Sequence, residues 1–103
     1  MTAEELAKSI GINEVGNNVD GSYVITLKDS NAFSRVYTLL DKAEGIDLDS
    51  DESTLSESAT VLVYLSDDFD IELRADLDNN SYTVSFKSAL EGDKNVTKNS
   101  END

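Results

Sequence analysis

The sequence contains no cysteine, histidine, proline or tryptophan. Without cysteine there is no disulfide framework, and without cysteine and histidine there is no Cys/His zinc site. The same absences exclude a cysteine nucleophile and a Ser–His or Cys–His catalytic pair. Positive charge is scarce as well: the chain has 22 acidic and 8 basic residues, and its net charge is −14. We therefore expect no direct binding to nucleic acid, whose phosphates would repel the chain.

Long apolar runs are also missing, since none approaches the roughly 18–20 residues that span a bilayer. The first ten residues carry Glu4 and Glu5 where a signal peptide carries basic residues. We expect no membrane association and a cytoplasmic location, which the absence of cysteine fits. The length of 103 residues predicts a single domain over residues 1–88. A flexible polar C-terminal tail is expected over residues 89–103.

Two segments have the pattern of helices. Residues 2–10 open with Thr2 and Glu5 in capping-box spacing and stop at Gly11. A longer helix is predicted before Gly45, because four apolar residues follow the spacing i, i+3, i+4, i+7 of an amphipathic helix. These residues are Phe33, Val36, Tyr37 and Leu40.

Four strands are predicted, over residues 22–28, 61–65, 69–77 and 81–87. Residues 69–77 alternate without error and place Phe69 and Leu77 inward. Residues 61–65 are continuously apolar, which predicts a central strand buried on both faces. Residues 11–21 have turn chemistry, with Ile12, Val15 and Val19 as core anchors or as part of a weak edge strand. Residues 46–60 are predicted to form an acidic loop with a single helical turn near residues 53–58.

These elements predict an α+β fold in the order α-β-α-β-β-β. The expected architecture is a small two-layer domain, in which a mostly antiparallel sheet of about four strands has the helices on one face.

The negative charge is concentrated in one part of the sequence. Residues 41–80 hold thirteen acidic residues and only two basic ones, Lys42 and Arg74. Residues two apart on a strand share a face at a spacing of about 6.6–6.8 Å. Acidic residues at this spacing would approximate alternate phosphates of one DNA strand, which rise about 3.4 Å per step. The predicted contact row is Asp67, Asp68, Asp70, Glu72 and Asp76.

Carboxylates of the loop would add long-range attraction for a basic partner. They are Asp47, Asp49, Asp51 and Glu52. Tyr64 lies on the other side of its strand from Val61 and Val63, so we expect it to be partly exposed and to anchor an interface. The plainer alternative is that all these charges only keep a solvent-facing strand soluble.

Metal binding and catalysis find less support in the sequence. Asp47, Asp49 and Asp51 spell the opening of a calcium loop, but Glu52 and Ser58 stand where that loop needs Gly and Glu. No cofactor is predicted, and a divalent-cation site is kept only as a third hypothesis. The strand before Arg74 resembles a metal-nuclease strand, but arginine cannot be deprotonated to act as a base. We expect no enzymatic activity.

In size, acidity and lack of catalytic residues, the chain resembles phage-encoded inhibitors that imitate nucleic acid, such as anti-restriction and anti-CRISPR proteins. The resemblance lies in composition and covers no motif. It implies a small non-enzymatic protein that occupies a basic, nucleic-acid-binding surface of another protein. The alternative is a structural or accessory module, such as a virion or assembly component, whose acidity serves solubility.

Overall fold

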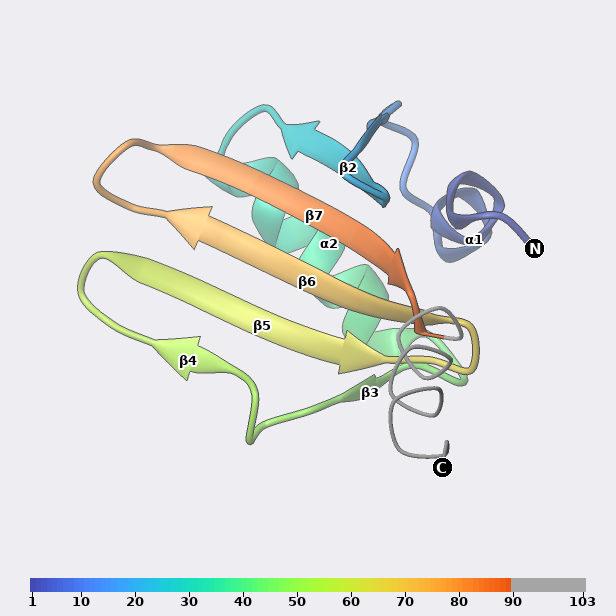
Figure 1. Ribbon diagram of the computed structural model, residues 1–103. Coiled ribbons are helices and arrows are strands. Elements are labelled where there is room, and N and C mark those ends of the chain that lie inside the picture. The colour runs from blue at the N-terminus through green and yellow to red at the C-terminus, as the bar shows by residue number, and fades with distance from the viewer. Residues whose placement is uncertain (90–103) are drawn as a thin grey trace.

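The computed structural model describes residues 1–89, which form two helices and seven strands (Figure 1). The helices are α1 (Ala3–Ile10) and α2 (Ser30–Lys42). The strands are β1 (Asn17–Val19), β2 (Ser22–Leu27), β3 (Asp47–Leu48), β4 (Thr54–Leu55), β5 (Ala59–Leu65), β6 (Phe69–Asp76) and β7 (Ser81–Ser88). They form one antiparallel sheet in the order β1-β2-β7-β6-β5-β3, and β4 also pairs with β5. The predicted polar tail, except Ala89, lies outside the described residues.

The predicted architecture, a small two-layer domain with about four strands and the helices on one face, is wrong. The sheet of residues 1–89 has seven strands where about four were expected, and the order of elements is α-β-β-α-β-β-β-β-β. Strand β1 was one of two alternatives for residues 11–21, and β3 and β4 were not predicted. All three are only two or three residues long. Such short segments are below the length at which an alternation can be recognised. The helical turn expected near residues 53–58 is also wrong, because β4 lies there.

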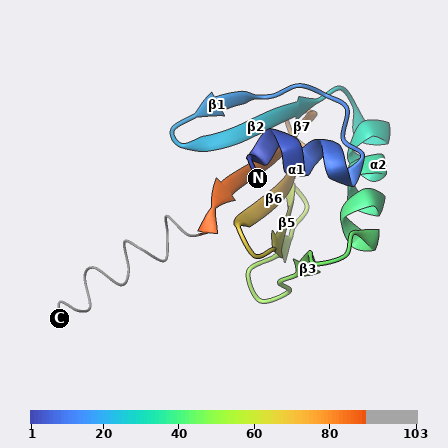
Figure 2. The ribbon, with the colours of Figure 1, turned by 90° about the vertical axis from the view of Figure 1, so that its right-hand side faces the viewer.

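The two helices do not lie together on one face of the sheet. Helix α2 covers one face and contacts β2, β6 and β7. Helix α1 lies across one end of the sheet, beside α2 (Figure 2). Its capping box is confirmed, since Thr2 N donates to Glu5 Oε1 at 2.7 Å and Glu5 N donates to Thr2 Oγ1 at 3.1 Å. Gly11 ends the helix at φ 115°, as predicted.

The core lies between α2 and the sheet. Helix α2 begins at the cap residue Asp29, whose side chain accepts a hydrogen bond from Ala32 N at 3.0 Å. It buries Ala32, Val36 and Leu40. The inward alternation predicted for the strands is confirmed at most positions. Of the strand residues predicted to point inward, the buried ones are Tyr23, Ile25, Leu27, Ile71, Leu73, Ala75, Val84 and Phe86.

Strand β5 is not buried on both faces, which corrects the interpretation of its apolar run. Val61 and Val63 are only half-buried, because no described element covers their face of the sheet. Leu65 is 41% exposed. A continuous apolar run does not distinguish its two faces, so the uncovered one could not be recognised. Leu77, expected to point inward, lies in the β6–β7 turn and is exposed.

A tight hairpin joins β1 to β2. Val19 pairs with Ser22, and the two residues between them, Asp20 and Gly21, have φ of 51° and 85°. Two such residues in succession are typical of a type I′ turn. Within the preceding segment Ile12 anchors the core, as expected, whereas Val15 and Val19 are 76% and 51% exposed.

Candidate functional site

One face of the sheet is covered by no described element, and we call it the open face. It lies opposite the face that packs on α2 (Figures 1 and 2). Cross-strand partners share a face in an antiparallel sheet, so the register identifies its members. In β5, β6, β7 and β2 they are Ala59, Val61, Val63, Leu65, Asp70, Glu72, Arg74, Asp76, Ser81, Thr83, Ser85, Lys87, Ser22, Val24 and Thr26.

Three residues of the predicted contact row lie on this open face, on β6. Asp70, Glu72 and Asp76 occupy alternating positions with Arg74 between the last two. The strand geometry sets neighbouring alternate positions about 6.6–6.8 Å apart. Arg74 Nε donates to Glu72 Oε2 at 2.9 Å, so this arginine neutralises the middle carboxylate of the row.

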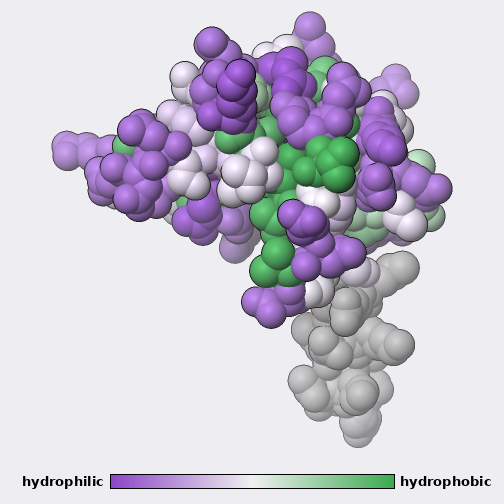
Figure 3. Space-filling view, turned by 90° about the horizontal axis from the view of Figure 1, so that it is seen from above, coloured by the Kyte–Doolittle hydropathy of each residue, from purple (hydrophilic) through white to green (hydrophobic). Residues whose placement is uncertain are grey.

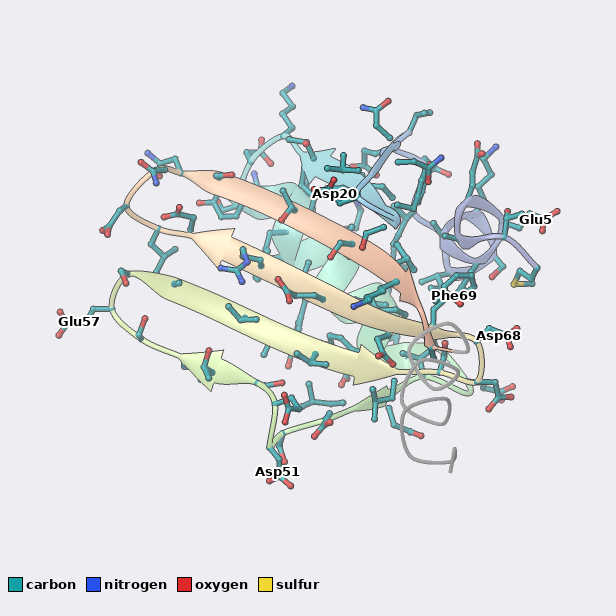
Figure 4. The ribbon with its side chains drawn as sticks, viewed as in Figure 1. Glu5, Asp20, Asp51, Glu57, Asp68 and Phe69 are labelled. Atoms are coloured by element: carbon teal, nitrogen blue, oxygen red, sulfur yellow. The ribbon has the colours of Figure 1, made fainter. Side chains whose placement is uncertain are left out.

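The other two residues of the row, Asp67 and Asp68, lie in the β5–β6 turn. Ser66 closes this turn, since Ser66 N donates to Phe69 O at 2.9 Å and Phe69 N donates to Ser66 Oγ at 3.2 Å. Asp68 therefore stands at the end of β6 (Figure 4). Asp67 and Asp68 also line a pocket at this end of the sheet, together with Glu44 and Phe69.

An apolar stripe runs along β5 beside the carboxylates. It consists of Val61, Val63 and Leu65, and we call it the β5 stripe. Val63 pairs with Glu72 and Leu65 pairs with Asp70. The sequence analysis missed this stripe, because β5 is apolar at consecutive positions and the alternation that marks a face is absent.

The loop carboxylates border the β5 stripe on its far side. Asp47 pairs with Leu65 and so shares the open face. Asp49 N donates to Val63 O at 2.8 Å, and Val63 N donates to Ser53 Oγ at 2.9 Å. These hydrogen bonds hold the connection between β3 and β4 along the edge of β5. Asp51 projects at that edge (Figure 4), and Glu52 follows it in the chain.

Tyr64 is buried, although it was expected to be partly exposed. It pairs with Ile71 on the covered face and is 1% exposed. Its hydroxyl has no hydrogen-bond partner, and burial, with smaller effects from Tyr37 and Asp41, raises the pKa of Tyr64 to about 12. Tyr64 therefore cannot anchor a partner at the surface, and the prediction that it is partly exposed is wrong.

The carboxylates of the open face differ in their local partners. Asp76 accepts hydrogen bonds from Asn79 Nδ2 at 2.8 Å and Asn79 N at 3.3 Å. The side-chain hydrogen bond from Asn79 is the main cause that lowers the pKa of Asp76. Asp70 has neither an ion pair nor a hydrogen bond from its side chain among residues 1–89. It faces Lys87 across the β6–β7 pair.

No group of three or more acidic side chains in residues 1–89 is arranged to hold a metal ion. In the candidate calcium loop, Asp49 Oδ1 accepts a hydrogen bond from Asp51 N at 3.2 Å. That carboxylate therefore serves the local turn of its own loop.

Within the described part of the chain, no helix is long and apolar enough to cross a membrane. In comparisons with protein-family models, curated proteins and solved structures, the chain matches none.

Proposed function

We propose that this protein is a non-enzymatic binding protein that uses the open face to occupy a basic, nucleic-acid-binding surface of another protein. The observation that carries the proposal is the pairing of two features on one uncovered surface. The β5 stripe offers apolar area to exclude water, and carboxylates lie on both sides of it. This order matches the apolar centre and polar rim of protein interfaces.

The charges favour a basic partner. Asp70, Glu72, Asp76 and Asp47 share the open face, and Asp49, Asp51, Glu52, Asp67 and Asp68 lie along its border. Opposed to them on that face are Arg74 and Lys87. A field of this sign attracts basic surfaces and speeds their encounter. The spacing along β6, near two phosphate steps of DNA, supports a surface that binds nucleic acid as the target.

The cytoplasm is the location we propose for this interaction. The absence of cysteine fits a reducing compartment. A phage-type inhibitor of host nucleic-acid enzymes would meet its targets there.

The proposal is tested by capture from a cytoplasmic lysate at about 50 mM and about 500 mM salt, with the protein immobilised. We expect nucleic-acid-binding proteins to be retained at low salt, released at high salt, and displaced by added duplex DNA. The triple variant D70N/E72Q/D76N should lose this capture. Its matched control, E4Q/D41N/E57Q, removes the same three charges elsewhere and should keep it.

Two results contradict the proposal. One is equal loss of capture in both triple variants, because only the total charge would then matter. The other is retained proteins that DNA does not displace, because the occupied surface would then not be a nucleic-acid site.

A second candidate function, an assembly module, is favoured by apolar side chains at the β1 edge. Figure 3 looks onto this side of the molecule and shows hydrophobic residues gathered between hydrophilic ones. Val19 in β1, and Val15 shortly before that strand, are exposed. Light scattering distinguishes the candidates, since an assembly module would self-associate and would do so equally in D70N/E72Q/D76N.

A further inference from the structure

The open face carries a hollow of about 180 Å³ between β5 and β2. Its lining includes Val63, Asp70, Glu72, Ser85, Lys87 and Ser22. The register explains why a depression forms here. Ser85 pairs with Glu72 on one side and with Val24 on the other, and Ser22 pairs with Lys87. The two serines are short, so the surface is low between the larger side chains around them.

The hollow has room for a side chain, because one water molecule takes only about 30 Å³ of liquid volume. Its lining joins an apolar wall at Val63 to hydroxyls and carboxylates. Of the two carboxylates, Glu72 is held by Arg74 at 2.9 Å. Asp70 is the one whose side chain has no partner among the described residues.

We propose that this hollow binds an arginine side chain of the partner, with Asp70 as the carboxylate that pairs with it. The inference rests on the proposed function, which supplies a basic partner. A guanidinium is planar, offers five donors and pairs with a carboxylate through two parallel hydrogen bonds. It is more weakly hydrated than an ammonium, so its plane can lie against Val63 while its remaining donors reach Ser22 or Ser85. A lysine provides neither the second parallel hydrogen bond nor the flat apolar contact.

Lys87 opposes this binding. It lines the same hollow, lies opposite Asp70, and has no ion pair within residues 1–89. Its ammonium repels an incoming cation and competes for Asp70. Removal of Lys87 is therefore expected to strengthen arginine binding, whereas removal of the Asp70 charge weakens it.

The test uses two short fluorescein-labelled peptides that alternate valine with either arginine or lysine, measured by fluorescence anisotropy at about 50 mM salt. We expect the arginine peptide to bind several-fold more tightly than the lysine peptide. D70N should weaken binding of the arginine peptide by about tenfold, as expected for a hydrogen-bonded charge pair. It should also remove the preference for the arginine peptide over the lysine peptide. K87Q should increase the affinity for the arginine peptide by about threefold. E57Q, which changes the charge at another end of the sheet, is the matched control and should leave the preference intact.

Amide NMR spectra of each variant verify the fold, and titration of the wild type locates the peptide. Shifts at Val63 and Ser85 support the hollow as the site. Equal affinity for the two peptides, or an arginine preference that survives D70N, overturns the inference, and so does binding of neither peptide. The proposed function is judged separately, by capture and DNA displacement, so each can fail without the other.

Discussion

At the scale of single residues, Tyr64 shows what burial does to a polar group that lacks a partner. Its ring is part of the core between the sheet and α2, while its hydroxyl is buried without a hydrogen bond. A buried unpaired hydroxyl carries a desolvation cost that phenylalanine would not have. Tyr64 was expected to be partly exposed because it lies on the other side of its strand from Val61 and Val63. The fold instead covers the face of Tyr64, which pairs with Ile71, and leaves the face of the two valines open.

Tyr64→Phe is expected to raise the free energy of unfolding by about 1 kcal/mol. The pH dependence provides a second check. Because the pKa of Tyr64 is raised from 10.0 to about 12 in the folded chain, the wild type loses stability as the pH rises from 10 to 12. The variant lacks this loss. Urea unfolding at neutral and alkaline pH measures both effects, and a destabilised variant at neutral pH would show that the hydroxyl has a partner.

At the scale of elements, the sequence was informative wherever an element was long and one-sided. Strands β6 and β7 alternate cleanly, and α2 has a regular apolar stripe, so their existence and inward faces could be predicted. Strand β5 was predicted, but its expected burial on both faces was wrong, since apolar residues on both faces do not indicate which face is covered. Strands β3 and β4 are each two residues long and exist only because β5 offers them a partner edge.

The candidate site was likewise predictable only where it lies on one regularly alternating strand. The row Asp70, Glu72 and Asp76 followed from the alternation of one strand. The β5 stripe and the hollow with Ser22 and Ser85 did not, because they require the order β2-β7-β6-β5. That order depends on long-range pairing, which local periodicity does not contain.

The β1–β2 hairpin depends on close packing at Gly16. Gly16 N donates to the Tyr23 hydroxyl at 2.9 Å, and a Cβ at this glycine would lie 2.5 Å from Val24 O. Gly16→Ala is therefore expected to cost about 2 kcal/mol, as overpacking commonly does. Gly21→Ala is the matched control, because φ of 85° strains alanine but the surrounding space is open, and its cost should be about 1 kcal/mol. Thermal unfolding of both variants measures which substitution destabilises the protein more. Equal losses of stability would show that the close contact at Gly16 relaxes without penalty.

At the scale of the whole molecule, the dominant fact is unbalanced charge. Residues 1–89 contain eighteen acidic side chains. Three of these form ion pairs with basic side chains, in the pairs Lys8–Glu4, Arg35–Glu14 and Arg74–Glu72. Most of these carboxylates therefore have no ion pair within residues 1–89, and their mutual repulsion opposes the compact state. A protein shaped only for stability would gain from fewer such groups.

Salt should therefore stabilise the free protein while it weakens the proposed complex. Between about 20 mM and about 500 mM sodium chloride the screening length falls several-fold, and we expect the midpoint of thermal unfolding to rise by roughly 5 °C. Calorimetry across this range measures the shift. D70N/E72Q/D76N and E4Q/D41N/E57Q should both show a smaller rise, because each carries three fewer negative charges. A midpoint that falls with salt would mean that the three ion pairs outweigh the repulsion. If both triple variants lose their salt response equally but only the first loses partner capture, the total charge governs stability and the position of the charge on the open face governs binding.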